Sequence, residues 1–115
     1  MVEDVRRGEV YWCRLDPSEG SEIRKTRPAV VVQNDVGNRN ARTTIVVPVT
    51  SAAPERAYPF IVTLPAPALP KQGFVNCAHI RAVDKRRLKP GPLAVLDEAT
   101  MARIDDALRA SLGLH

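Results

Sequence analysis

The chain has 115 residues, of which 44% are hydrophobic and 26% charged, and its formal net charge is +4 at pH 7. This balance is ordinary for a soluble globular protein and differs from that of a disordered chain, and the length suits one domain, residues 1–115. The longest apolar runs, PAVVV and TIVVPV, are too short to span a membrane, and MVEDVRRGEV lacks the apolar core of a secretory signal. The positive charge is weak evidence for an anionic partner.

The cysteine and histidine content gives little support for a disulfide or a metal site. Cys13 and Cys77 are the only cysteines and form no C-x-x-C pair, so we expect free thiols in a cytoplasmic protein. His79 and His115 are the only histidines, and neither has a second ligand at a helical or hairpin spacing. We therefore expect no metal and no cofactor.

Short strands separated by turn residues are predicted for the first two thirds of the chain. GEVYWCRLD alternates between two faces, and the β-branched run PAVVVQN is typical of a buried strand that begins at Pro28. DVGNRNART has the glycine and asparagine content of a turn. Further strands are expected in TIVVPVT, YPFIVTL and GFVNCAHIRAVD.

The C-terminal segment LDEATMARIDDALRASLGLH predicts an amphipathic helix. Its apolar residues recur near a 3.6-residue period, Asp97 is a plausible N-cap, and Gly113 marks the end. The fold class predicted from these elements is mainly β with a C-terminal α-helix. It would be a small, strongly bent antiparallel sheet or SH3-like barrel that the helix closes.

The segment SEIRKTRPAVVVQND places Arg24, Lys25 and Arg27 directly before the second predicted strand. Pro28 disfavours the helical region for the residue before it, so Arg27 should be extended at the strand start. A guanidinium held in this way suits a phosphate, because its planar fork offers paired donors and stays charged. The alternative is a solvated basic turn.

Two other segments carry polar groups that have both a functional and a structural explanation. Thr50 and Ser51 end the strand VVPVTS, where their hydroxyls either cap a turn or reach a group on a neighbouring strand. RAVDKRRLK contains five bases and one acid, which form either a patch that follows a nucleic-acid backbone or a solvated sheet edge. The five aromatic residues lie mostly in patterns that predict core-facing side chains, which argues against a base-stacking platform.

Several of these segments together resemble the MazF/PemK toxins of type II toxin–antitoxin systems. The resemblance runs in order from about Arg7 to Leu88 through RGEVYWCRLDPSEGSE, TRPAVVVQND, GNR, TTIVVPVTS and HIRAVDKRRL. It implies a homodimer that cleaves single-stranded RNA at short sequences without metal, leaving 2′,3′-cyclic phosphate and 5′-hydroxyl ends. It also implies an acidic, MazE-like antitoxin as partner. TTIVVPVTS and the terminal helix are the segments that we expect to contribute to the dimer.

The resemblance also assigns roles to individual residues. The family's essential arginine before the proline falls on Arg27 and its essential threonine on Thr50, so these are the expected catalytic residues. Departures from the family affect the proton transfers, because Asn76 and Ala78 stand where one branch has an arginine and an aspartate. His79 replaces a common glutamine and is a candidate for proton transfer or base contact. The remaining RNA contacts are expected at Glu22, Arg24, Lys25, Ser51, Asn76, Arg81, Lys85 and Arg86.

Two other functions fit the same sequence. One is a non-enzymatic toxin similar to CcdB, whose C-terminal residues, typically a Trp–Gly pair, contact a protein target, although this chain ends in ASLGLH. The other is a small RNA-binding module without catalysis.

Overall fold

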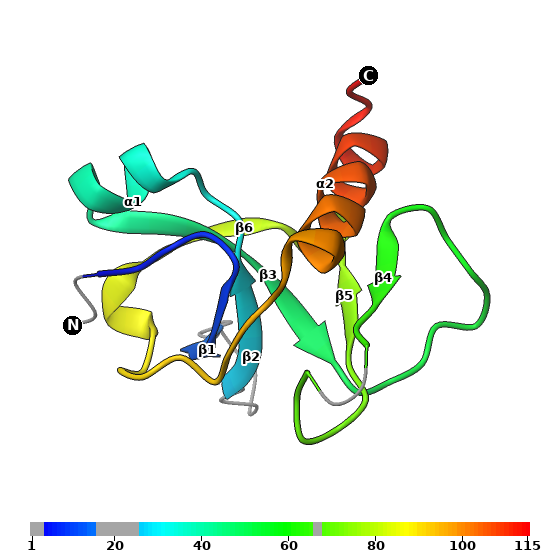
Figure 1. Ribbon diagram of the computed structural model, residues 1–115, viewed down its shortest axis with the longest axis horizontal. Coiled ribbons are helices and arrows are strands. Elements are labelled where there is room, and N and C mark those ends of the chain that lie inside the picture. Colours follow the sequence, from blue (N-terminus) through cyan, green and yellow to red (C-terminus); the bar gives the residue numbers. More distant parts are fainter. Residues whose placement is uncertain (1–3, 16–25, 66–67) are drawn as a thin grey trace, which may run out of the picture.

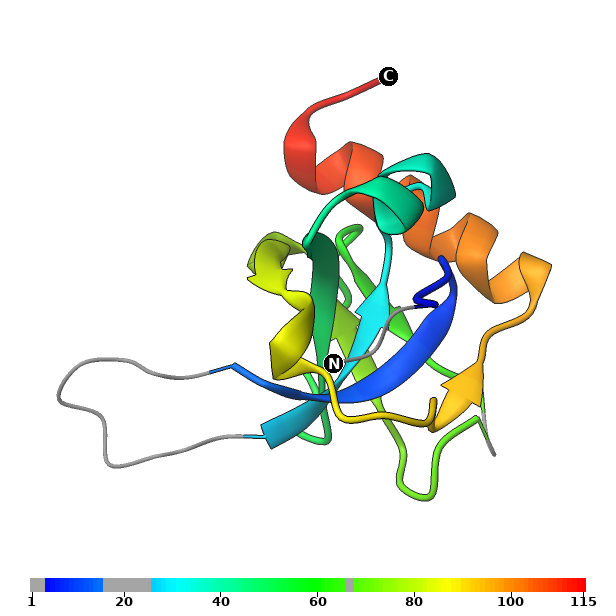
Figure 2. The same cartoon turned by 90° about the vertical axis from the view of Figure 1, so that its left-hand side faces the viewer.

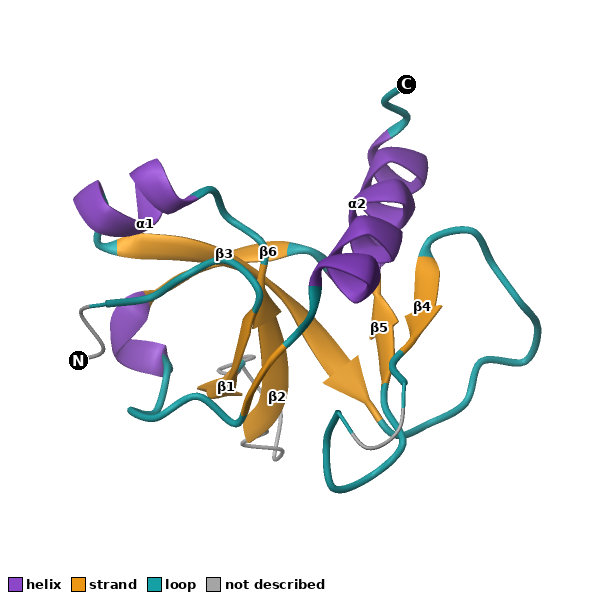
Figure 3. Ribbon diagram, in the orientation of Figure 1, coloured by secondary structure: helices purple, strands orange, loops and turns teal. Residues whose placement is uncertain are grey.

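The computed structural model describes residues 4–15, 26–65 and 68–115, and it contains a curled antiparallel sheet and a C-terminal helix (Figures 1 and 3). The predicted fold class is therefore confirmed, in the form of a half-barrel. The strands and helices of the described residues are β1 Glu9–Arg14, β2 Thr26–Val31, α1 Asp35–Asn40, β3 Thr43–Thr50, β4 Ile61–Thr63, β5 Phe74–Asn76, η1 Cys77–His79, β6 Arg81–Asp84, η2 Lys85–Arg87, β7 Ala94–Val95 and α2 Glu98–Leu112.

Strand β3 is the centre of the sheet, whose strand order is β4-β5-β3-β2-β1-β7, with β6 also paired to β3. One edge of β3 pairs with β2, and its other edge is shared by β6 and then β5. Both edges are occupied, so β3 cannot dimerise by adding a strand from a second copy. A contribution of this segment to a dimer would have to come from its side chains.

The strands carry two layers of apolar side chains, one on each face. Val10, Val30 and Val47 belong to a first core cluster, which Met101 and Ile104 of α2 complete. The residues between them on β1, β2 and β3 belong to a second core cluster on the opposite face, together with side chains from β6 and the segment after it: Tyr11, Cys13, Ala29, Val31, Val46, Val83 and Leu88. This alternation is the period of two expected for strands buried on both faces.

Helix α2 begins and ends where the sequence predicts. The Asp97 side chain accepts a hydrogen bond from the Thr100 backbone N–H at 2.8 Å, and Gly113 ends the helix with φ of 72°. Arg7 ties this helix to the start of the chain, because its guanidinium donates to Asp105 of α2 and, at 2.8 Å, to the carbonyl of Val32.

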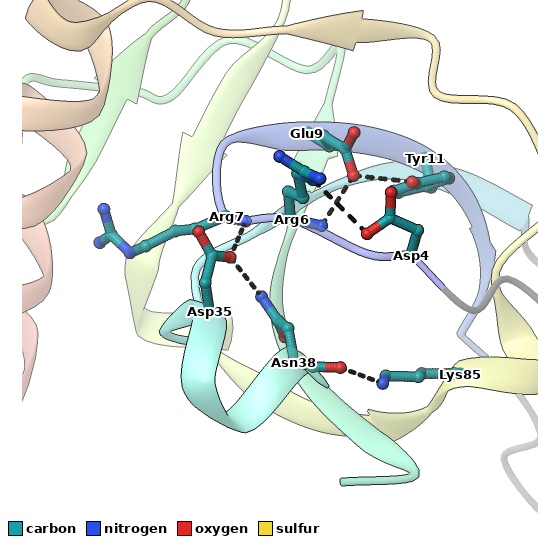
Figure 4. A network of polar contacts seen from close by, with 8 residues as sticks. All are labelled: Asp4, Arg6, Arg7, Glu9, Tyr11, Asp35, Asn38 and Lys85. Carbon is teal, nitrogen blue, oxygen red and sulfur yellow. Dashed lines mark hydrogen bonds and ion pairs between the residues drawn. The ribbon is translucent and has the colours of Figure 1, made fainter. Parts of the chain in front are cut away.

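The predicted turn in DVGNRNART is wrong, because this segment contains the short helix α1. Asn34 caps the helix by accepting from the Gly37 N–H at 2.7 Å. Asn38 is fully buried and accepts from the Thr44 hydroxyl at 2.7 Å, while its backbone carbonyl accepts from the Lys85 ammonium (Figure 4). Tertiary hydrogen bonds therefore stabilise a helix of only six residues, which its own propensity would not.

Helices α1 and α2 lie at one end of the molecule, while β2 begins and β3 ends at the other (Figures 1 and 2). None of the helices in the part of the chain that the structure describes is long and apolar enough to cross a membrane. The end opposite the helices is where the candidate site lies.

Candidate active site

The two residues with expected catalytic roles lie on adjacent strands at the same end of the sheet. The β2–β3 ladder ends at the pair of Ala29 with Pro48, and Arg27 and Thr50 each lie two residues beyond this pair, at the same end of the sheet. The β2–β3 register therefore brings together a guanidinium and a hydroxyl that lie 23 positions apart in the sequence (50 minus 27).

Both residues line one cavity of about 280 Å³, which Ser51 also lines. The loop from Leu69 to Gly73 also lines the cavity. Most of the remaining lining is apolar and comes from Trp12, Pro28, Val49 and Leu93. The site is thus a largely apolar hollow that has two bases, Arg27 and Lys71, and two hydroxyls among its lining residues.

The polar groups of Arg27 and Thr50 are available for a ligand. The Thr50 hydroxyl oxygen accepts from the Ala52 N–H at 3.1 Å, which is the turn-capping role that the sequence left open, and the hydroxyl proton remains for a further acceptor. Arg27 is half-buried on a strand paired with β1. Within residues 4–15, 26–65 and 68–115, no hydrogen bond or ion pair holds its guanidinium.

Further guanidinium groups lie close to β1, next to Arg27. Arg81 donates to the carbonyl of Leu15 at 2.8 Å, and Arg87 donates to that of Arg14 at 3.1 Å. Burial raises the pKa of the Cys13 thiol to about 11, and the charges of Arg81 and Arg87 act in the opposite direction. Cys13 is the direct strand partner of Arg27, so these bases extend the positive charge along the same face of the sheet.

The bases of η2 are placed differently from Arg81. Lys85 is buried, with 5% of its surface exposed, and its ammonium donates to the Asn38 carbonyl. It therefore stabilises α1 and presents no charge to a ligand, contrary to its expected role as an RNA contact. Arg86 is exposed, but its guanidinium is paired with Asp84 at 3.1 Å.

Asn76 and His79 lie at the two ends of η1, between β5 and β6. The Asn76 side chain caps this turn by accepting from the Ala78 N–H at 3.0 Å. His79 belongs to the 3₁₀ turn rather than to a strand, and it is exposed. Neither residue lines the cavity beside Arg27 and Thr50. Three other expected RNA contacts, Glu22, Arg24 and Lys25, lie outside the described residues.

Trp12 is the residue of this site that sequence reasoning missed. Its alternation with Val10 predicted a core-facing side chain, but the indole is 41% exposed and lines the cavity. The signal that could have identified it is positional, because Trp12 pairs with Pro28, directly beside Arg27. The described residues contain no group of three or more histidine, cysteine, aspartate or glutamate side chains that could hold a metal ion.

Comparisons with known proteins agree on one family. The family model described as PemK-like, MazF-like toxin of type II toxin–antitoxin system matches residues 6–112. A curated relative, Endoribonuclease MazF from Staphylococcus epidermidis, is 39% identical over 113 residues, which cover 96% of this chain and 93% of that protein.

Solved structures give the same result at the level of the backbone. MazF from Deinococcus radiodurans superimposes with a TM-score of 0.79 at 32% identity, covering 96% of this chain and 97% of that one. A mycobacterial endoribonuclease in complex with its cognate antitoxin gives a TM-score of 0.80 at 31% identity, covering 96% and 97%. This chain belongs to the PemK-like, MazF-like toxin family of type II toxin–antitoxin systems.

Proposed function

We propose that this protein is the toxin of a type II toxin–antitoxin pair and that it cleaves single-stranded RNA at short sequences. The observation that carries the proposal is the meeting of Arg27 and Thr50 at one cavity, in a chain that the family model matches almost from end to end. The relatives compared above are endoribonucleases, and this activity agrees with the site.

RNA supplies its own nucleophile, the 2′-hydroxyl next to the scissile phosphate. Its oxygen forms a bond to phosphorus while the bond from phosphorus to the 5′-oxygen breaks, which leaves a 2′,3′-cyclic phosphate and a 5′-hydroxyl. One proton leaves the 2′-oxygen and one joins the departing 5′-oxygen. Because the nucleophile belongs to the substrate, the reaction needs no metal-bound water.

The protein's main task is then to hold the phosphate and to neutralise the charge that builds up on it. Arg27 carries a guanidinium at the start of β2 and is the group that we assign to the crowded phosphate. Thr50 keeps a hydroxyl proton available after its oxygen has accepted from Ala52, so it orients a phosphate oxygen or the 2′-hydroxyl. Arg81 contributes positive charge from the same side of the sheet.

A guanidinium is a poor general base because its pKa exceeds about 12, so the proton from the 2′-oxygen needs another acceptor. His79 is the candidate, since it is exposed and lies two residues before Arg81, which begins β6 and pairs with Val46 of β3. The comparison of wild type with His79→Gln over a range of pH tests this role. A rate and pH profile that do not change would assign His79 to base contact or to no role at all.

The expected partners follow from the same proposal. An acidic antitoxin peptide would compete with RNA for the positive surface near Arg27 and Arg81. We also propose a homodimer in the cytoplasm, and sedimentation at micromolar concentration tests it. A monomer at that concentration would count against the dimer without affecting the assignment of the site.

The experiment that tests the function is incubation of antitoxin-free protein with long single-stranded RNA in EDTA, followed by mapping of the cut positions and end chemistry. Arg27→Ala is the test variant, and Arg103→Ala is the matched control, because Arg103 is an exposed arginine on α2. A DNA copy of the substrate tests the need for a 2′-hydroxyl. We expect cuts with cyclic phosphate ends in wild type and Arg103→Ala, and none in Arg27→Ala or on DNA.

Arg27→Ala also distinguishes an enzyme from a binding module. An enzyme loses cleavage by far more than it loses RNA affinity, whereas a binder loses affinity in proportion to one phosphate contact. Intact RNA in every sample, after removal of bound antitoxin and with varied substrates, would contradict the proposed activity.

A further inference from the structure

Beside Arg27 and Thr50, the cavity has a set of walls that phosphate chemistry does not use. Trp12 is 41% exposed there, although most large apolar side chains of the sheet are buried. Val49, Leu69 and the paired Pro28 complete a largely apolar enclosure. Exposure of the apolar indole ring to water is unfavourable in the free protein. A flat ligand that covers the ring would bury this surface and gain contact area.

We propose that this cavity is a nucleobase subsite, in which the base of a nucleotide next to the scissile phosphate stacks on Trp12. The inference rests on the proposed RNA cleavage and adds a recognition residue to it. No role for Trp12 follows from the cleavage chemistry itself, because the indole has no group that transfers a proton or neutralises a phosphate.

Side chains alternate between the two faces of each strand, and this alternation separates the residues that would contact the phosphate from those that would contact the base. Trp12 and Val49 are two residues along from Val10 and Val47, so they face the side of the first core cluster. Arg27 and Thr50 alternate to the other face, where the charges of Arg81 and Arg87 also lie. The strand ends therefore form a boundary with a basic surface on one side and an apolar hollow on the other. A nucleotide has the same division between its phosphate and its base.

The size of the cavity suits a base. Its volume of about 280 Å³ is just below the range of about 300–1,000 Å³ that is typical for drug-sized ligands. Base-edge recognition has candidates in the Ser51 hydroxyl and in Gln72, whose amide nitrogen donates to the Leu64 carbonyl at 2.9 Å. That bond fixes the carboxamide and leaves its oxygen as an acceptor for an amino group on a base.

A base fits this lining better than an antitoxin side chain does. Both an RNA strand and an acidic peptide would complement Arg27 and Lys71, the two charged residues in the lining. A flat aromatic wall with hydroxyl and amide groups at its margin matches the face and the edge of a base. An aliphatic anchor from a peptide would use neither the stacking surface nor the edge groups.

Intrinsic fluorescence reports on this site directly, because Trp12 is the only tryptophan in the sequence. The probe is a short RNA that contains the mapped cut site, with a 2′-deoxy nucleotide in place of the attacking one so that it cannot be cleaved. We expect the RNA to quench the fluorescence of wild type. An abasic nucleotide at one position beside the cut should prevent the quenching. RNA that binds, as measured by anisotropy, without changing the fluorescence would overturn the inference.

Kinetics on the same substrates give an independent test. Trp12→Ala should lower kcat/KM on intact RNA by about 5- to 150-fold, the range expected for loss of one base stack, and Trp12→Phe should retain most of the activity. On the abasic substrate, the Trp12→Ala and wild-type proteins should be nearly equal, because the interaction is already absent. Tyr58→Ala is the matched control, since Tyr58 is an exposed aromatic residue outside the cavity. If Trp12→Ala and the abasic nucleotide lower kcat/KM independently, so that their fold-losses multiply, the inference is overturned.

The remaining outcomes separate this inference from the proposed function. If wild type cuts RNA but Trp12→Ala lowers kcat/KM by the same factor on intact and on abasic RNA, the proposed function stands and the proposed subsite is wrong. A Trp12→Ala protein that cuts normally but is inhibited more weakly by an acidic antitoxin peptide assigns the cavity to the antitoxin and overturns the inference. Melting curves for each variant exclude loss of folding as the cause of lost activity.

Discussion

Replacement of Asn38 by alanine should destabilise the protein more than any other single change on α1. Asn38 is fully buried, and its side chain makes four hydrogen bonds. The amide nitrogen donates to the Gln33 carbonyl at 3.0 Å and to the Asp35 carboxylate at 3.1 Å. The amide oxygen accepts from Gln33 at 3.0 Å and from the Thr44 hydroxyl at 2.7 Å.

The magnitude follows from the partners that the change leaves behind. Thr44 is fully buried, so loss of its acceptor costs about 1–3 kcal/mol. The bonds to Gln33 and Asp35 are only partly buried, and each adds about 0.5–1 kcal/mol. With three such bonds, the losses together amount to about 2.5–6 kcal/mol of unfolding free energy and centre on about 4 kcal/mol. With an unfolding entropy of about 2.1 cal/mol/K per residue over 115 residues, Tm should fall by about 17 °C.

The assay is thermal and urea unfolding followed by circular dichroism. Asn40→Ala is the matched control, because Asn40 lies on the same helix, is exposed, and makes one side-chain hydrogen bond, to the Val36 carbonyl at 2.8 Å. It should change the unfolding free energy by less than about 0.5 kcal/mol. Addition of Thr44→Val to Asn38→Ala should cost less than the two single changes predict, since the hydroxyl that lost its acceptor is then absent. Equal losses for Asn38→Ala and Asn40→Ala would refute the reasoning.

Three further changes test other parts of the structure. The bond from the Thr100 N–H lowers the pKa of Asp97, so the stability it adds is present above the ordinary pKa of about 3.8 and is lost as pH falls through the lowered value. Wild type should therefore lose more stability than Asp97→Asn between pH 5 and about pH 2 in urea titrations, and parallel curves would contradict this. Burial raises the pKa of Cys13 and Cys77 to about 11, so iodoacetamide at about pH 8 should label both thiols only after unfolding, as mass spectrometry can measure. Gly73→Ala would set a Cβ 2.7 Å from a methyl of Val49, so it should lower the unfolding free energy in urea by about 1–3 kcal/mol. An unchanged unfolding free energy would show that the loop moves to accommodate the methyl group.

Local patterns predicted the elements whose causes are local. The alternation of apolar residues predicted β1 and the continuous β-branched run predicted β2, and in both cases burial on two faces follows from the side chains themselves. Helix α2 has its N-cap, its apolar period and its terminal glycine within one segment, so Asp97 and Gly113 could be assigned before the structure was known.

The predictions that failed concern residues whose interaction partners are distant in the sequence. Helix α1 contains Gly37 and three polar residues that favour turns, and what stabilises it is Asn38 in contact with Thr44 and Lys85. Lys85 was expected at an RNA surface because it stands among other bases, but its acceptor lies 47 positions away and is not visible in the sequence.

The candidate site was partly predictable for the same reason. Arg27 and Thr50 each stand at a strand end that can be recognised from sequence, so their meeting required only that the two strands be antiparallel neighbours. The role of Trp12 was not predictable, because its alternation with the buried Val10 is the pattern of a core residue, and the loop from Leu69 to Gly73 that lines the same cavity is distant in the sequence.

Helix α2 supplies the last part of the first core cluster, and this has a consequence for how the protein is made. Leu96, Met101, Ile104 and Ala107 are all buried in that cluster, and the Asp105 partner of Arg7 lies on the same helix. A chain that stops before Leu96 should therefore remain unfolded by circular dichroism. On the ribosome, one face of the sheet stays uncovered until α2 has been synthesised. The active site at the far end of the sheet would therefore be held in place only after the residues of α2 have left the ribosome.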